Sequence, residues 1–273
     1  MVPRMTCAQQ LSVSTAALPG WQIEDALRAI ASCGITNVEI VVGSAPDALQ
    51  HDTRYIDRLR TILGVNGLEV VGVAASGELP AGHPGLPNVI SVAQALGARY
   101  VRIFPPKFAD VVPLRDQIEQ MRVGLIDLCE HFDESTMEIL IELAQDTLVP
   151  SPELARAALR PLDRHCIGVL YDPANMLVEG HLSVDLALAC LEGLLRHVHV
   201  KNQVVTRQAG QLHRRFVSLQ QGGVDWEGTL RALTRSGYRG GFTIDHLGGS
   251  PSPRRIRQDA MTFQTIYSRA TDD

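Results

Sequence analysis

The stretch His197-Val198-His199-Val200-Lys201 places two imidazoles and an ammonium group on one side of an extended chain and two valines on the other. Side chains of a β-strand point alternately to its two faces, so the pattern indicates a strand with one polar and one apolar face. A strand in a parallel sheet is covered on both faces, and polar side chains there need partners. The pentapeptide therefore predicts a buried polar surface that is suited to holding a ligand.

Outward from this strand, apolar runs rich in β-forming residues alternate with amphipathic stretches along the whole chain. We expect strands at 5–11, 36–42, 68–75, 98–104, 137–143, 166–172, 195–202 and 240–246. We expect helices at 22–33, 53–66, 86–97, 114–132, 152–160, 183–193, 225–236 and 253–269. Strict alternation predicts a parallel sheet, and eight units fit a closed barrel better than an open sheet.

The length of 273 residues and the absence of a compositional break favour a single domain that spans residues 1–273. The predicted fold class is therefore α/β, a single-domain (β/α)8 TIM barrel. The longest stretch without a predicted helix or strand is 203–225, which we interpret as an unstructured loop. Connections of this length are often binding loops, and its Arg215 is a candidate contact for an anionic group.

Composition excludes several classes of protein. A formal charge of −5 and a pI near 6.0 provide no basic surface for nucleic acid. No apolar run approaches the roughly 20 residues of a membrane span, and the N-terminal residues lack the pattern of a secretory signal. The five cysteines are scattered without metal-site spacing, which favours reduced thiols. We expect a cytoplasmic protein without a nucleic-acid or membrane partner.

Polar side chains end several of the predicted strands, and the active site of such a barrel lies at the C-terminal strand ends. Glu142 ends the fifth strand and Asp172 the sixth, while Asp245 follows an alternating pattern that directs it into the barrel. The seventh strand adds His197, His199 and Lys201, and the second adds Glu39.

Three carboxylates and an imidazole at one place repel one another as ions unless a positive charge lies among them. One interpretation is a divalent cation, for which an oxygen-rich site with one imidazole suits Mn²⁺, Mg²⁺, Co²⁺ or Zn²⁺. The other is a set of internal partners, with Asp172 capping a helix or pairing with Lys201. Glu142 would then pair with Arg102 or Lys107. Both interpretations remain open at this stage.

Short motifs recur in a characteristic order and cover nearly the whole chain. They are Gly34-Ile35-Thr36-Asn37-Val38-Glu39, Ile141-Glu142, Tyr171-Asp172-Pro173-Ala174-Asn175, His197-Val198-His199-Val200-Lys201-Asn202, Gly222-Gly223-Val224-Asp225-Trp226, Gly237-Tyr238-Arg239-Gly240 and Phe242-Thr243-Ile244-Asp245. In this order the chain resembles the xylose isomerase-like barrel superfamily. Its members include sugar isomerases, sugar 3-epimerases, hydroxypyruvate isomerases and inosose dehydratases.

The resemblance implies a divalent-metal-dependent isomerase or epimerase that acts on a small sugar, keto-sugar or hydroxy-keto acid through an enediolate. Family metal ligands fall on Glu142, Asp172, His199 and Asp245, and the catalytic candidates are Glu142, Asp245 and Lys201. Substrate-binding candidates are Glu39, Lys107, Asn175, His197, Arg215 and His246. The partner would be a small sugar or polyol-derived substrate, and because members often dimerise, a homodimer is a further expectation.

Four positions depart from the family pattern. Asp245 stands where a longer glutamate is usual, and Ala144, Asn175 and Asn202 replace groups that serve acid–base chemistry in other members. Two alternative hypotheses therefore stay open beside the isomerase. One is a lyase that dehydrates an inosose or 3-dehydroshikimate-like substrate. The other is a degenerate barrel that binds a ligand without turnover.

Overall fold

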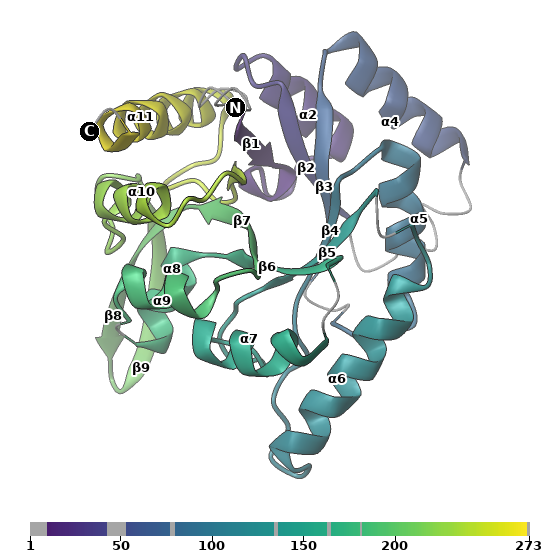
Figure 1. The fold of residues 1–273 in the computed structure, drawn as a ribbon. Coiled ribbons are helices and arrows are strands. Elements are labelled where there is room, and N and C mark those ends of the chain that lie inside the picture. Colours follow the sequence, from purple (N-terminus) through teal and green to yellow (C-terminus); the bar gives the residue numbers. More distant parts are fainter. Residues whose placement is uncertain are drawn as a thin grey trace.

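Eight parallel strands close into a barrel in the order β1-β10-β7-β6-β5-β4-β3-β2, surrounded by helices (Figure 1). The computed structural model describes residues 10–42, 53–76, 80–133, 136–162, 165–180 and 182–271. The barrel strands are β1 (Leu11–Ser14), β2 (Asn37–Val42), β3 (Glu69–Ala75), β4 (Tyr100–Ile103), β5 (Glu138–Glu142), β6 (Ile167–Tyr171), β7 (Leu195–Val200) and β10 (Gly241–Ile244). The predicted fold class is confirmed.

Helices follow the barrel strands along the chain. They are α2 (Ile23–Ala31), α4 (Thr53–Val65), α5 (Leu86–Leu96), α6 (Leu114–Cys129), α7 (Pro152–Leu159), α8 (Pro173–Glu179), α9 (Val184–Cys190), α10 (Trp226–Arg235) and α11 (Pro253–Thr271). Short 3₁₀ turns are η1 (Thr15–Ala17) and η2 (Arg160–Leu162). Helix α8 was not predicted, because its seven residues are too few to show a helical period.

The position of the first strand was predicted incorrectly. We expected 5–11, whereas β1 runs from Leu11 to Ser14, and residues 5–9 lie outside the described residues. The observed strand is short, and its two inward positions are serines that pair with β2 and β10. The other seven expected strands all overlap the observed ones.

The segment 203–225 was also predicted incorrectly, since much of it is ordered as an antiparallel hairpin. Strands β8 (Asn202–Gln208) and β9 (Gln211–Val217) pair with each other alone, outside the barrel. Ala209 and Gly210 form the two-residue turn with positive φ angles of 48° and 80°, which suits a tight hairpin. Most of β9 is exposed and polar, so it lacks the apolar alternation that marks a half-buried strand.

The apolar core lies between the barrel and the helices. Val198 and Val200 face outward into it, and Phe242 packs against Phe263 with ring centroids 5.2 Å apart. The barrel interior, by contrast, holds polar side chains and a small apolar cluster of Tyr100, Leu140 and Leu170. Gly72 on β3 makes room for the ring of Tyr100, because a Cβ there would lie 2.1 Å from it.

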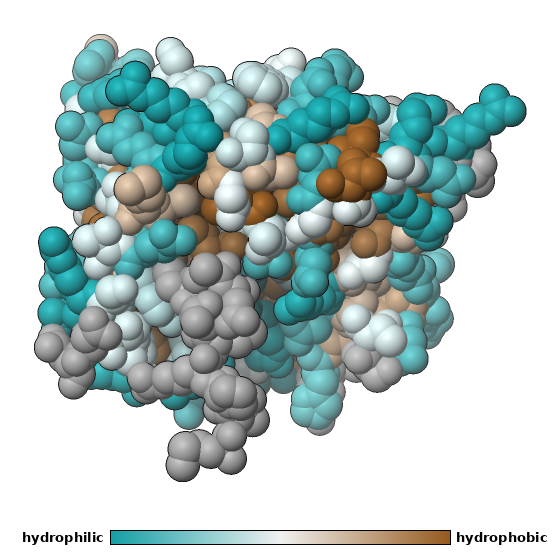
Figure 2. Space-filling model, turned by 90° about the horizontal axis from the view of Figure 1, so that it is seen from above, coloured by the Kyte–Doolittle hydropathy of each residue, from teal (hydrophilic) through white to brown (hydrophobic). Residues whose placement is uncertain are grey.

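On the face seen in Figure 2, hydrophobic residues form a band between larger hydrophilic regions. No helix in the described part of the chain combines the length and apolar character that a membrane span requires.

Candidate active site

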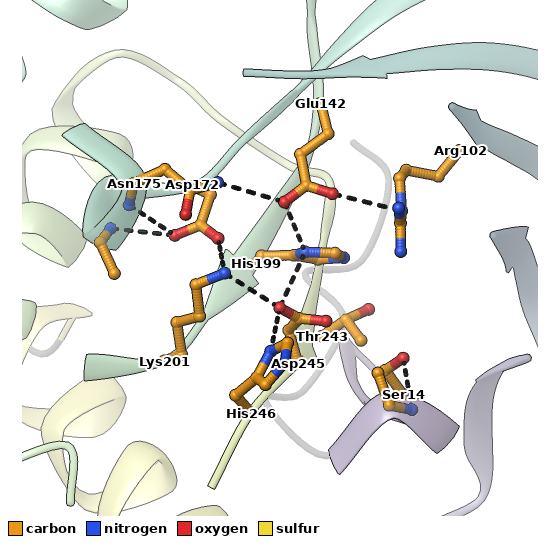
Figure 3. A network of polar contacts seen from close by, with 12 residues as sticks. Ser14, Arg102, Glu142, Asp172, Asn175, His199, Lys201, Thr243, Asp245 and His246 are labelled. Carbon is orange, nitrogen blue, oxygen red and sulfur yellow. Dashed lines mark hydrogen bonds and ion pairs between the residues drawn. The ribbon is translucent and has the colours of Figure 1, made fainter. Parts of the chain in front are cut away.

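Four side chains meet at the C-terminal ends of neighbouring barrel strands (Figure 3). Glu142 ends β5, Asp172 follows β6, His199 lies on β7 and Asp245 follows β10. All four are buried, and one potential ligand atom from each lies within 4.8 Å of the others. The structure thus brings together the four residues that were expected to hold a metal. With Lys201 they form what we call the upper layer of the barrel interior.

His199 is oriented by Glu39. Its Nε2 lies 3.3 Å from Glu39 Oε2, which also accepts a hydrogen bond of 3.0 Å from the hydroxyl of Tyr100. On the other side of the ring, Nδ1 lies 3.6 Å from Glu142 and 3.8 Å from Asp245 and makes no hydrogen bond.

When Nε2–H donates to Glu39, the lone pair of Nδ1 is directed toward the carboxylates. In metal proteins, a carboxylate that accepts the N–H of a ligand histidine holds the orientation of the ring in the same way. Three carboxylates and one oriented imidazole nitrogen therefore fit a divalent cation.

Asp172 and Glu142 also have the internal partners of the alternative interpretation. Asp172 Oδ1 caps α8 by accepting from the backbone N–H groups of Ala174 and Asn175, and its Oδ2 lies 2.6 Å from Lys201 Nζ. Glu142 Oε2 lies 3.3 Å from Arg102 Nε, and its Oε1 accepts from the Asn175 amide at 3.3 Å. Lys107 is exposed on the loop after β4 and pairs through its backbone with Thr147.

Charge interactions in the upper layer outweigh burial at most positions. Burial raises the pKa of Glu142, but Arg102 and His199 outweigh it and hold that pKa below its ordinary value. Burial likewise opposes ionisation of Asp245, yet Lys201 and His246 hold its pKa well below the usual range.

The pKa values of the remaining two groups, Asp172 and His199, are both raised, but for different reasons. The pKa of Asp172 is raised, chiefly because the carboxyl is buried. Burial lowers the pKa of His199, but the carboxylates of Asp245, Glu39 and Glu142 raise it well above 6.5.

A second polar layer lies deeper in the barrel and is formed by Ser12, His197 and Thr243. His197 Nε2 lies 2.7 Å from Thr243 Oγ1, which in turn lies 2.6 Å from Ser12 Oγ. Burial and the neighbouring His199 lower the pKa of His197 to about 3. His197 is thus neutral and hydrogen-bonded. The structure places it in this lower layer, away from the mouth.

The hairpin contributes residues to the rim of the site, and sequence reasoning missed one of them, Phe216. Phe216 of β9 stacks on His246 with ring centroids 4.4 Å apart, and His246 Nδ1 lies 2.6 Å from Asp245 Oδ2. Arg214 contacts Gln145 after β5 through the amide oxygen of that glutamine. Arg215 lies between these two in sequence and so on the opposite face of the hairpin. Alternation along 212–216 would have shown this, had the strand been recognised.

Two asparagines that depart from the family pattern have structural partners. Asn175 donates to Glu142 and to the carbonyl of Leu143, so it positions the carboxylate. Asn202 donates to the carbonyls of Leu219 and Val224 and accepts from the N–H groups of Gln203 and Val224. An aspartate could not make both donations, so the amide at 202 follows from how this chain supports its loop.

Solved structures share this fold over almost their whole length. A xylose isomerase-like TIM barrel protein from Mycobacterium smegmatis, in complex with magnesium, has a TM-score of 0.73 and 19% identity, covering 97% of this chain and 99% of that one. An L-ribulose 3-epimerase has a TM-score of 0.75 and 15% identity over 98% and 96%. A 3-keto-D-glucoside 4-epimerase from E. coli has a TM-score of 0.72 and 14% identity over 94% and 98%.

Comparison by sequence gives a match to a family model but none to an individual curated protein. No curated protein matches the chain significantly. The family model for the xylose isomerase-like TIM barrel, in contrast, matches residues 27–266, which include every barrel strand except β1 and all four residues of the candidate metal site. The chain belongs to the xylose isomerase-like TIM barrel family.

Proposed function

We propose that the protein is a divalent-metal-dependent isomerase or epimerase of a small sugar, keto-sugar or hydroxy-keto acid. The observation that carries the proposal is the buried group of Glu142, Asp172, His199 and Asp245, whose potential ligand atoms lie within 4.8 Å of one another. The names of structural neighbours support the substrate class, since they include epimerases of L-ribulose and of a 3-keto-D-glucoside.

The four residues would hold Mn²⁺, Mg²⁺, Co²⁺ or Zn²⁺. When bound, such a cation supplies positive charge beside a substrate oxygen and lowers the cost of removing the proton from the neighbouring carbon. The orphaned Nδ1 of His199 supports this assignment, because a buried nitrogen without a hydrogen bond is costly unless a ligand uses it.

Glu142 is the base in this proposal. Its lowered pKa keeps the carboxylate ionised, and Arg102 and Asn175 hold it from two sides. It takes the proton from the C–H next to the substrate carbonyl, which leaves an enediolate. Addition of a second proton, taken from solvent on the side of Asp245, to the opposite face of the same carbon gives an epimer, and Glu142 then releases the first proton to solvent. Return of the first proton from Glu142 to the neighbouring carbon, with a proton moving between the two substrate oxygens, gives an isomer.

The positive groups have separate roles. Lys201 is buried in the upper layer and carries a charge that can stabilise negative charge on a substrate oxygen. His246 is partly exposed at the mouth, with 34% of its side chain accessible, and Lys107 lies on the rim. We propose both as substrate contacts, whereas Glu39, Asn175 and His197 act through neighbouring side chains.

Proton exchange with solvent tests the proposal. Protein purified without chelator and supplied with Mn²⁺ or Mg²⁺ is incubated in D₂O with a panel of ketoses, aldoses and hydroxy-keto acids. We expect loss of one substrate C–H signal in the proton NMR spectrum, and a loss of about 10²-fold to 10⁴-fold in its rate for Glu142→Gln. The matched control is Glu138→Gln on the same strand, which pairs with Arg196 at the other end of the barrel.

Other outcomes would identify the alternatives. An ultraviolet-absorbing enone or aromatic product would indicate the lyase. Metal binding without exchange on any substrate of the panel would indicate a non-catalytic barrel. Absence of bound metal under supplementation would contradict the proposal.

A further inference from the structure

Lys201 lies among the carboxylates that are proposed to hold the metal. Its Nζ is 2.6 Å from Asp172 Oδ2 and 3.1 Å from Asp245 Oδ2, and the residue is only 5% exposed (Figure 3). An ammonium group at these distances forms charge-assisted contacts with both carboxylates. Half of the proposed ligand set is therefore engaged by a cation that belongs to the chain.

Asp172 has one oxygen left for a bound ion, and Oδ2 of Asp245 already has two partners. Asp172 Oδ1 accepts two backbone N–H groups at the start of α8, at 2.9 and 3.3 Å, so Oδ2 is the oxygen that faces the site. Asp245 Oδ2 accepts from both Lys201 and His246. If Lys201 only positioned a metal-binding carboxylate, its ammonium group would be expected to donate to the carboxylate oxygen that does not bind the metal. Here the ammonium contacts the oxygen of Asp172 that is left for coordination.

We propose that Lys201 is a tethered cation that competes with the divalent ion for Asp172 and Asp245, so that the metal enters by displacing the ammonium group. This inference rests on the metal site of the proposed function. Carboxylate oxygens contact divalent ions at about 2.0–2.6 Å, and two positive charges sharing the same oxygens repel each other strongly in a buried site.

The hairpin provides a place for the displaced group. The ring of Phe216 lies 5.7 Å from Lys201 Nζ, and a lysine side chain can shift on its flexible stem toward such a ring. The ammonium group would then remain near the mouth, where it can meet a substrate oxygen. Lys201 would thus weaken metal binding and balance the buried carboxylates when the ion is lost.

Metal affinity in the absence of substrate tests the exchange. Calorimetric titration of metal-stripped protein with Mn²⁺ or Zn²⁺ is expected to give a dissociation constant at least tenfold lower for Lys201→Met than for the wild type. Lys107→Met is the matched control, because it removes the same charge from the rim without a contact to these carboxylates. Its affinity should stay within twofold of the wild type.

A measurement on the wild type avoids dependence on a variant that buries unpaired carboxylates and could fail to fold. The sequence has two lysines, Lys107 and Lys201, so lysine labelled with ¹³C and ¹⁵N gives two resolvable side-chain signals. Addition of Mg²⁺ or Zn²⁺ should shift the Nζ signal of Lys201 and speed exchange of its protons with water. The signal of Lys107 should not move.

The outcomes separate this inference from the function on which it rests. Equal or weaker metal affinity of Lys201→Met, or an unmoved Lys201 signal while the wild type binds metal, would overturn the exchange and leave the metal site in place. Failure of both proteins to bind any of the ions at millimolar concentration would overturn both proposals. Binding by Lys201→Met alone would support the exchange.

Discussion

His197 and His199 lie two residues apart on β7 and point into the same barrel, yet their surroundings differ. His197 bonds to the hydroxyl of Thr243, and its pKa falls to about 3 because the ring is buried without a carboxylate contact. His199 is equally buried, but the carboxylates of Asp245, Glu39 and Glu142 raise its pKa well above the ordinary value. His197 is therefore neutral, whereas His199 is protonated in the absence of metal and would be a ligand when a metal ion is bound.

The difference between the two layers shows which buried polar groups are built for chemistry. In the lower layer, Thr243 bonds to both His197 and Ser12, and no fully buried side-chain nitrogen or oxygen of the three is left without a hydrogen bond. In the upper layer, His199 Nδ1 is buried and makes no hydrogen bond, and Asp172 Oδ2 has the ammonium group of Lys201 as its partner. A neutral network whose buried atoms are hydrogen-bonded stabilises a fold. A cluster of charged groups in which a buried atom has no hydrogen bond marks a ligand site.

The largest expected effect comes from removing one histidine of the pair at a time. His199→Ala should weaken Mn²⁺ or Zn²⁺ binding by more than the roughly 100-fold that is typical for loss of a group behind a ligand. His197→Ala should retain metal binding within a few-fold and instead destabilise the fold by about 2–4 kcal/mol, through a cavity and a lost hydrogen bond. Calorimetric titration and denaturant unfolding of both variants measure these effects. Comparable metal affinities in the two would contradict the division into layers.

Much of the barrel and most of the upper layer could be predicted from sequence because both depend on local patterns. Alternation at 197–201 directs His199 and Lys201 inward, and the ends of the neighbouring strands place Glu142, Asp172 and Asp245 at the same edge. Strand order then brings these ends together, whatever the details of packing.

The contacts that decide the chemistry could not be predicted in the same way. Glu39 reaches His199 across the barrel, and that distance depends on the stagger of strands far apart in sequence. Phe216 reaches His246 because β8 and β9 form a polar hairpin outside the barrel. The sequence of this hairpin has no alternation of apolar and polar residues from which it could be predicted. Whether Asp172 met a metal, a helix start or Lys201 was also open, and the structure shows the last two at once.

The contact between Glu39 and His199 provides the next test. Glu39→Gln keeps the shape of the side chain but removes the charge that holds Nε2–H of His199, and we expect metal affinity to fall by about 10-fold to 100-fold. Tyr100→Phe removes only the 3.0 Å hydrogen bond behind Glu39 and should cost less than Glu39→Gln. Titration with Mn²⁺ gives both values. An unchanged affinity for Glu39→Gln would show that the Nε2 contact does not orient the ring.

The raised pKa of His199 predicts a pH dependence of metal binding. Because that pKa lies well above 6.5, the ring is protonated near neutral pH, and a cation that binds Nδ1 must release the proton. Below this pKa, metal affinity should therefore increase about tenfold for each unit by which the pH is raised. Calorimetry in two buffers of different ionisation enthalpy should show release of about one proton for each ion bound. Release of no proton would mean that the ring is already neutral, as His197 is.

The smallest expected effect concerns His197 and the stability of the whole fold. Its folded pKa of about 3 lies below the ordinary value of 6.5, so between these values the unfolded chain binds a proton that the folded chain excludes. Stability must then fall as pH falls through this window, with His197 contributing about 1 kcal/mol for each pH unit. His197→Gln, compared with the exposed His131→Gln, should flatten urea unfolding free energies between pH 6 and 4. Equal slopes in the two variants would show that the lower layer accepts a proton, and the contrast with His199 would then rest on charge in the upper layer alone.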